Sequence, residues 1–270
     1  MDQEQEARDI VGLALSGGGF RAPIFHLGVI RFLHEVDRLK GVKRLSSVSG
    51  GSVLAAHLAL NWERYTNNDK FDNAAKELLQ FVQRGIRGQI IRRYIFGWIA
   101  LVPRFLLPRS KRWTLDNLLQ KSFERLFKRA ALDKLHGPEV FINSTSLTSG
   151  SPCYFGPEGF VWFEGDNKNS ISSDETLVSF AVAASSAFPP LFPPITISYE
   201  SLGCTHKEFQ RPQCLTDGGV YDNLGINSLI WQQQKTAARG IVLVSDAEGL
   251  FDSEFEKHYS PRSARSIAPD

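Results

Sequence analysis

The N-terminal part of the chain alternates short apolar runs with helical periodicities. Residues 10–15 are apolar and lead directly into glycines at 17–19, a pattern that predicts a strand ending in a tight turn. A helix is expected next, because Phe25, Val29, Phe32 and Val36 lie four, three and four positions apart, as apolar residues do in an amphipathic helix. Gly41 is placed to end this helix, because glycine readily adopts the left-handed conformation found at helix C-termini.

A second strand and a second helix complete this unit. Residues 42–48 predict a strand, and residues 50–60 predict a helix that is apolar on nearly every face, which is typical of a buried helix. Strand, helix, strand and helix in this order indicate two parallel strands joined by a right-handed crossover. Parallel neighbours end at the same edge of a sheet, so we expect Ser16 and Ser49 there, where open α/β folds hold their sites.

The rest of the chain continues the mixture of strands and helices. Strands are expected at 139–144, 159–163, 214–216 and 240–245, and helices at 176–187 and 226–234. Residues 251–270 are polar and without periodicity, which predicts a loose tail. The length of 270 residues suits one domain over residues 1–270 with its core at about 10–250, and we expect a three-layer α/β/α fold with a mainly parallel central sheet.

Composition narrows the range of partners. The chain is 42% hydrophobic and 22% charged, as globular proteins are, and its net charge of +2 is too small to indicate a nucleic-acid partner. Its three cysteines do not suggest a disulfide framework, and Cys204, His206 and Cys214 match no common zinc spacing, so we expect no metal. Residues 1–9 do not resemble a signal peptide, and the apolar stretch at 94–102 is too short to span a membrane. A cytoplasmic protein is expected, with signal-independent secretion left open.

Ser49 lies in the first candidate site, the segment 47–51, between an expected strand and an expected buried helix. This is the context of a nucleophile elbow, in which a strained turn raises a serine hydroxyl above the sheet and small residues are needed two positions to either side. The following helix adds free backbone N–H groups and the positive end of its dipole. Taken alone, however, the serines of this segment are better explained as N-cap residues of an ordinary helix.

Gly17, Gly18 and Gly19 form the second candidate site. Without a Cβ, their N–H groups can turn inward and stabilise the charge that develops when a serine attacks an ester. Arg21 follows, and either braces this loop or meets a phosphate. The stretch also fits a loose G-x-G-x-x-A dinucleotide fingerprint, but that fingerprint needs an acidic residue ending the second strand, and Asp37 falls at the end of the helix. A P-loop is excluded because no Gly-Lys-Ser/Thr follows.

Asp217 is the candidate base, although an aspartate followed by two glycines is often only a turn residue. Histidine is the usual base for a serine, and the chain has six: His26, His34, His57, His136, His206 and His258. His57 lies on the same helix as Ser49 but roughly 12 Å along its axis. His26 is more simply explained as a packed or solvated residue. His258 is the serious competitor, because Ser49, Asp217 and His258 follow the order of an α/β-hydrolase triad.

Together these residues resemble the patatin-like phospholipase family over most of the chain, from Gly12 to Gly225. Four motifs in order carry the resemblance, namely Gly17-Gly18-Gly19-Phe20-Arg21 as the oxyanion loop, Ser49 as the nucleophile, Ala184-Ser185-Ser186-Ala187-Phe188-Pro189 as the Ala-Ser-x-Ala block, and Asp217-Gly218-Gly219. Ser47 and Ala22 stand where the family usually has glycine. Both residues are small, so we expect the geometry to survive.

The resemblance implies a lipid acyl hydrolase of the phospholipase A type. Asp217 is then the base that accepts the proton of Ser49, and Ser49 forms an acyl-enzyme. The amides of Gly17, Gly18, Gly19 and Gly50 are expected to hold the oxyanion. The expected partner is a phospholipid or glycerolipid substrate, and neither a cofactor nor a metal is required. No motif specifies the head group, the acyl length or an activating protein partner.

Residues 84–113 combine eight Lys or Arg residues with large apolar residues and contain no acidic residue. This combination suits a surface that lies on anionic lipid, so a lid or membrane-facing insertion with peripheral membrane contact is expected here. A core helix pair with a solvated basic edge explains the same pattern equally well. Two other functions stay open, namely a soluble carboxylesterase with a Ser49–Asp217–His258 triad and a non-catalytic lipid- or nucleotide-binding module.

Overall fold

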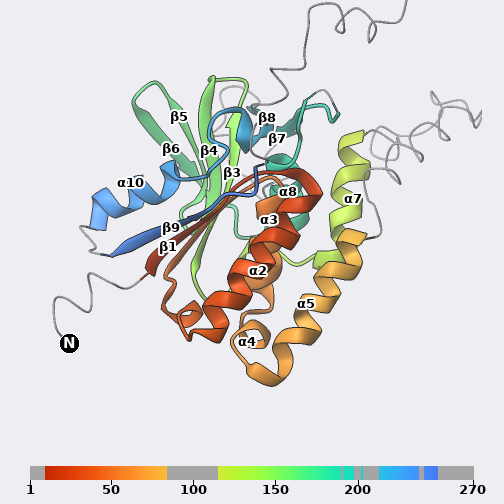
Figure 1. The fold of residues 1–270 in the computed structure, drawn as a ribbon. Helices are drawn as coiled ribbons and strands as arrows, with labels where there is room; N and C mark the ends of the chain where they lie inside the picture. Colours follow the sequence, from red (N-terminus) through yellow and green to blue (C-terminus); the bar gives the residue numbers. More distant parts are fainter. Residues whose placement is uncertain are drawn as a thin grey trace, which may run out of the picture.

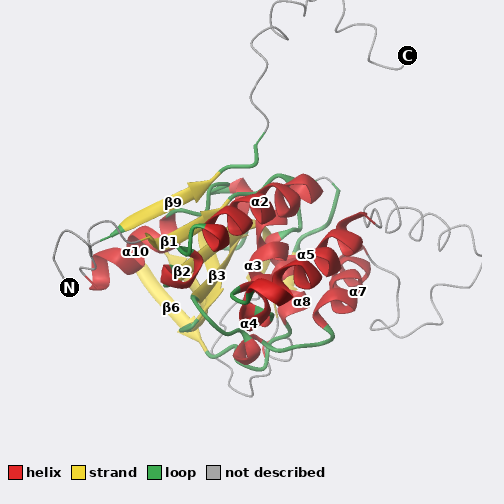
Figure 2. Cartoon of the chain, turned by 60° about the horizontal axis from the view of Figure 1, so that its bottom comes forward, coloured by secondary structure: helices red, strands yellow, loops and turns green. Residues whose placement is uncertain are grey.

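The computed structural model describes residues 10–83, 115–189, 191–197, 202, 213–236 and 240–248. Within these ranges nine strands form one sheet in the order β6-β5-β4-β3-β2-β1-β9, and β8 and β7 join it beside β3. Helices lie on both faces of this sheet (Figures 1 and 2), so the predicted three-layer α/β/α fold is confirmed. The insertion expected at 84–113 and the tail expected at 251–270 lie outside the described residues.

The parallel part of the sheet forms its centre and one edge. It consists of β9 (Ile241–Ser245), β1 (Ile10–Leu15), β2 (Arg44–Val48) and β3 (Glu139–Ser146). β1 has the predicted bounds, and β1, α2 (Ala22–Glu35) and β2 make the predicted parallel crossover. Leu15 lies beside Ser47 in the register, which brings the residues that follow both strands to the same edge of the sheet.

Beyond β3 the sheet becomes antiparallel. β4 (Ser151–Gly156), β5 (Gly159–Glu164) and β6 (Asn167–Ile171) continue it as successive hairpins. β8 (Gln213–Asp217) also runs antiparallel to β3, and the short β7 (Ile195–Ile197) pairs with β8. β3 is therefore the strand at which the direction of pairing changes.

Alternation along the strands divides the interior into two cores. Leu13 and Leu15 of β1 point to the larger core, which is filled by helices α3 (Gly50–Leu60), α5 (Asn68–Gln83), α7 (Leu115–Phe127) and α8 (Val178–Ser185). Ala14, between them, points to a smaller core that is closed by Leu229 of α10 (Asn227–Thr236). Figure 2 shows α10 on the opposite face of the sheet from the other helices. α3 is buried from Gly50 to Ala59, as its uniform apolar pattern predicts.

The helix that the spacing of Phe25, Val29, Phe32 and Val36 predicts is present as α2, but these residues do not form its buried face. The residues that α2 buries are Ala22, Pro23, His26, Leu27, Ile30 and Leu33. Phe25 and Phe32 are 52% and 60% exposed, and Val36 is 45% exposed. Both the buried residues and the exposed residues of α2 follow helical spacing. The buried set has the smaller side chains on average, and it packs against the small residues of α3.

The end of α2 also differs from the prediction. The helix ends at Glu35, before Gly41, which lies in the short 3-10 helix Leu39–Gly41. Asp37 takes the left-handed position with φ 53°, and the amide of Arg38 donates to the carbonyl of Leu33 at 2.8 Å. This is the hydrogen-bond pattern of a Schellman motif, with aspartate in the place that glycine usually takes. None of the helices in the described ranges has the length and apolar character needed to cross a membrane.

Candidate active site

The turn at Ser49 joins β2 directly to α3. Ser49 has φ 51° and ψ −119°, a conformation that is uncommon for a residue with a side chain and that stores strain. Ser49 occupies the N-cap position, but its hydroxyl makes no capping hydrogen bond. The explanation of Ser49 as an ordinary N-cap residue is therefore contradicted, and the geometry is that of a strained strand-to-helix elbow.

The glycines after Ser49 are required by close packing of the backbone. A Cβ on Gly51 would lie 2.5 Å from the carbonyl oxygen of Leu15 and 2.6 Å from that of Ser16. A Cβ on Gly50 would collide with the carbonyl oxygen of Gly19. The elbow is thus pressed against the end of β1 and the glycine loop, and only glycine fits at these two positions.

A row of serine hydroxyls supports the elbow from the side of α8. The amide of Ser49 donates to Ser185 Oγ at 2.9 Å, and Ser185 Oγ lies 2.9 Å from Ser52 Oγ. Ser52 in turn donates to Ser47 Oγ, and Ser47 donates to the carbonyl of Phe141. Ser47 thus takes part in this row, which accounts for a serine at the position where an elbow usually has glycine.

The glycine loop follows β1 and reaches the same edge of the sheet. Gly18 and Gly19 have φ 143° and 63°, conformations that glycine adopts readily and other residues rarely do. The amide of Gly17 donates to the carbonyl of Asn223 at 2.9 Å. Gly17 therefore belongs to the base of the loop, and its amide is not among the donors that an incoming oxyanion would meet, contrary to the sequence prediction.

His26 anchors the base of this loop, a role that no sequence motif indicates. Its ring is fully buried, with Nε2 3.0 Å from the carbonyl oxygen of Ser16 and Nδ1 2.7 Å from Ser245 Oγ. A carbonyl only accepts, so Nε2 carries the proton and Nδ1 accepts from the serine. Burial lowers the pKa of His26, an effect larger than the opposing one of its bond to Ser16, and this favours the neutral ring. Ser16 Oγ accepts the amide hydrogen of Ala247 at 2.8 Å, so β9 is joined to the same anchor.

Asp217 ends β8 and is 2% exposed. Its Oδ1 accepts the amide hydrogen of Gly219 at 2.8 Å, which fixes one oxygen of the carboxylate. Asp222, in the same loop, has a different role, because its two oxygens accept the amides of Gly225 and Asn227 at the start of α10. Asp222 is therefore the turn and capping residue, whereas Asp217 lies buried at the end of β8.

The pairing of β3 explains how Ser49 and Asp217 meet. β2 pairs with β3 up to Val48 and Asn143, and β8 pairs with it from Asp217 and Ser144. β4 occupies the other edge of β3 along residues 142–146, so β2 and β8 must share one edge and meet end to end there. The chain turns away at each end, and a Cβ on Gly218 would lie 3.2 Å from Val48 Cγ1.

A cavity of about 580 Å³ opens at this point and brings most of the predicted site together. Its walls contain the candidate catalytic and oxyanion residues and several neighbours, namely Gly18, Gly19, Phe20, Arg21, Ser49, Phe188, Asp217, Gly219, Asn223, Ala247 and Glu248. Gly50 lines a narrower, mainly apolar pocket of about 30 Å³ that shares Ser49 and Phe188 with the cavity. Val53, Phe123 and Phe192 close this pocket, which therefore offers an apolar surface directly beside the hydroxyl of Ser49.

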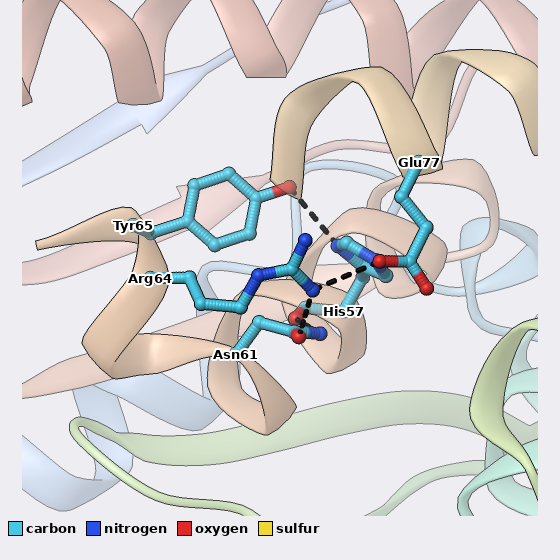
Figure 3. A network of polar contacts seen from close by, with 5 residues as sticks. All are labelled: His57, Asn61, Arg64, Tyr65 and Glu77. Atoms are coloured by element: carbon cyan, nitrogen blue, oxygen red, sulfur yellow. Dashed lines mark hydrogen bonds and ion pairs between the residues drawn. The ribbon is translucent and has the colours of Figure 1, made fainter. Parts of the chain in front are cut away.

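None of the histidines that the structure describes is among the residues that line this cavity. His57 is buried at the far part of α3, where its Nδ1 lies 3.0 Å from the hydroxyl of Tyr65, and burial lowers its pKa to about 4. Figure 3 shows the surrounding network, in which Arg64 Nη1 lies 2.8 Å from Glu77 Oε2. His34 stacks on Phe71, and neither lines the cavity. His206 and His258 lie outside the described residues, as does Cys204.

The alternative chemistries receive no support from the described residues. Asp37 belongs to the end of α2 and not to the end of β2, so the acidic residue of a dinucleotide site is absent from that position. No group of three or more His, Cys, Asp or Glu side chains in the described ranges is arranged to hold a metal ion.

Comparisons with known proteins give a family match and structures of similar fold. The family model of patatin-like phospholipases matches residues 13–230. Human GIVD cytosolic phospholipase A2 is structurally similar, with a TM-score of 0.52 and 15% identity over 84% of this chain and 42% of that one. VipD from Legionella pneumophila is similar with a TM-score of 0.45 and 17% identity, over 96% of this chain and 53% of that one. A comparison with curated protein sequences found no match.

Proposed function

The chain belongs to the patatin-like phospholipase family, and from this premise we propose that it hydrolyses fatty acyl esters of phospholipids or glycerolipids with Ser49 as nucleophile and Asp217 as base. Membership places it, at family level, among lipid acyl hydrolases. One observation carries the finer proposal. A strained serine and a buried carboxylate, brought from opposite ends of the sequence, line the same cavity together with Gly18 and Gly19.

The proposed reaction has two steps. In the first, Asp217 accepts the hydroxyl proton of Ser49 while Oγ attacks the ester carbonyl, and the carbon–oxygen bond then breaks as the alcohol leaves with that proton. In the second, Asp217 takes a proton from water, the resulting hydroxide attacks the acyl-enzyme, and the fatty acid leaves as Ser49 regains its proton. No metal or cofactor takes part in either step.

Stabilisation of the oxyanion has to supply much of the rate, because an ordinary carboxylate is a weak base for a serine. The Ser49 amide is already bonded to Ser185, so we assign the donor of the elbow to the Gly50 amide at the start of α3. We assign the remaining donors to the amides of Gly18 and Gly19, which line the same cavity as Ser49. The positive end of the α3 dipole adds to their effect.

Two further features of the cavity suit a lipid substrate. Arg21 is exposed at its wall, where a guanidinium is well suited to a phosphate. The apolar pocket formed by Val53, Phe123 and Phe192 lies beside Ser49, where the beginning of an acyl chain would be placed.

The decisive experiment measures fatty acid release from mixed phospholipid vesicles by the wild-type chain and by Ser49→Ala and Asp217→Asn. We expect release by the wild type and its loss in both variants, with circular dichroism unchanged. Asp222→Asn is the matched control, since it removes a carboxylate charge five positions from Asp217 but keeps one capping acceptor, and it should retain most of the activity. Full activity in Asp217→Asn would refute Asp217 as the base. Loss of activity in both Asp217→Asn and His258→Ala would favour the Ser49–Asp217–His258 triad over the dyad.

A further inference from the structure

Large apolar side chains are exposed on the segments that line the candidate active-site cavity. They are Ile24, Phe25, Phe188, Leu191, Val220 and Tyr221, with exposures between 39% and 54%, and they form what we call the apolar rim. Phe188 lines the cavity itself, and Val220 directly follows Gly219, another residue of its wall. Leu191 lies in the turn closed by the hydrogen bond from the amide of Phe192 to the carbonyl of Phe188.

Ile24 and Phe25 belong to the rim because of helix geometry. They lie three and four positions after Arg21, which lines the cavity, and residues so spaced are neighbours on one helix surface. Figure 1 shows the start of α2 at the same end of the molecule as β8. Segments distant in sequence thus contribute exposed apolar side chains to one opening.

Such a rim points to a binding surface, because soluble monomers rarely expose several large apolar side chains together. The charges beside it are of both signs, since Arg21 and Glu248 are both exposed at the cavity wall. Among the described residues of the cavity wall, these opposite charges offer no strong electrostatic complement to a charged partner. It suits an uncharged apolar phase, and a protein seated on it would close the cavity that the substrate must enter.

We propose that the apolar rim is the surface with which the chain docks onto a lipid bilayer, so that the carboxyl edge of the parallel strands faces the membrane. The proposal rests on the proposed function in one respect, because a lipid substrate must pass from the bilayer into the cavity. It differs from the sequence hypothesis for residues 84–113, which requires anionic lipid. Docking through the rim operates on zwitterionic lipid and depends little on salt.

The test uses co-flotation with pure phosphatidylcholine vesicles at low and high salt, in a Ser49→Ala background that leaves the vesicles intact. The double variant Ile24→Gln/Phe25→Gln removes one side of the rim, and Leu191→Gln removes part of another. The matched control is Phe32→Gln/Val36→Gln, two similarly exposed residues of the same helix and its C-cap that lie roughly 12 to 16 Å further from the cavity along the axis.

We expect the Ile24/Phe25 variant to lower the vesicle partition coefficient by about tenfold or more, and the Phe32/Val36 control to leave it within about twofold. Equal losses in both would overturn the proposal and indicate a partner that covers the whole outer face of α2. Binding that needs anionic lipid would also overturn it, and would favour residues 84–113.

A second readout separates this inference from the proposed function. Each rim variant is also made with Ser49 intact and assayed on a soluble short-chain ester, where we expect turnover within about twofold of wild type because the chemistry is untouched. If neither the wild type nor any variant hydrolyses the soluble ester or vesicle phospholipid, while the rim variants still lose vesicle binding, the proposed function fails and the docking surface stands. If the rim variants hydrolyse both the soluble ester and vesicle phospholipid normally, the docking surface fails and the proposed function stands.

Discussion

Replacing Ser185 by alanine removes the acceptor of the Ser49 amide, at 2.9 Å, together with the contact to Ser52 Oγ at the same distance. Ser185 is fully buried at the end of α8, so water cannot take the place of the lost hydroxyl without a rearrangement. The substitution leaves a partly buried N–H group without its partner at Ser49, the candidate nucleophile, whose backbone is strained.

The size of the effect follows from two contributions. A buried donor that loses its acceptor costs about 1–3 kcal/mol of stability. The conformation of Ser49 stores roughly 1–3 kcal/mol, and it persists only while neighbouring contacts hold it. If the turn relaxes to relieve that strain, an equal loss of transition-state stabilisation lowers kcat by roughly 5- to 150-fold, because each ~1.4 kcal/mol is a factor of ten. The KM should change little, since the walls of the cavity stay in place.

Urea denaturation and steady-state kinetics on a soluble ester measure the two effects separately. Ser179→Ala is the matched control, because Ser179 is a buried serine of the same helix whose hydroxyl has no hydrogen-bond partner in the described structure. It should be neutral or slightly stabilising, with unchanged kcat. A Ser185→Ala variant that keeps its kcat within about twofold would refute the reasoning, and would show that other contacts hold the elbow.

Two further predictions concern stability. Gly51→Ala should prevent folding or lower the free energy of unfolding by more than about 3 kcal/mol in urea denaturation, because its Cβ would meet the carbonyl oxygens of Leu15 and Ser16. Gly28→Ala, with open space at an exposed helix position, should instead stabilise the chain by about 0.5–1 kcal/mol. Similar values for the two variants would contradict the packing argument. Burial lowers the pKa of His57 from 6.5 to about 4, so the unfolded chain takes up the proton first as the pH falls. Stability should therefore drop by up to roughly 3 kcal/mol between the unfolded and folded pKa values, and a His57→Gln variant that kept the same drop would exclude His57 as its source.

Local patterns were sufficient for several elements beside the candidate site. β1 was predicted with its observed bounds, and apolar runs predicted β2 and α3 on either side of Ser49, although segment 47–51 taken alone fitted an ordinary N-cap better than an elbow. These features depend on neighbouring residues, so a sequence displays them directly. The end of α2 at Asp37 was missed because aspartate rarely takes the left-handed position, and the prediction relied on the glycine nearby.

Features that depend on distant partners were not predictable in this way. The bonds of His26 join it to Ser16 and to Ser245, which lies 219 positions away, and no spacing rule connects them. The packed face of α2 was chosen by the shape of α3 and not by the size of the apolar side chains on α2 itself. β4 and β6 were also missed, because Pro152 and the polar run at 167–171 conceal the alternation that marks a strand.

β2 and β8 share one edge of β3, and this sharing brings the two candidate catalytic residues together. Ser49 comes from the parallel half of the sheet and Asp217 from an antiparallel strand, and they meet because β2 and β8 end at adjacent positions, Asn143 and Ser144, on one edge of β3. A slip of either strand by one residue would move its side chains to the other face of the sheet. Gly218 lets the end of β8 lie close to the end of β2, since a Cβ there would be 2.6 Å from the carbonyl oxygen of Asn143 and 3.2 Å from Val48 Cγ1. Correct pairing of β3 on that edge is therefore the step of folding that creates the candidate active site.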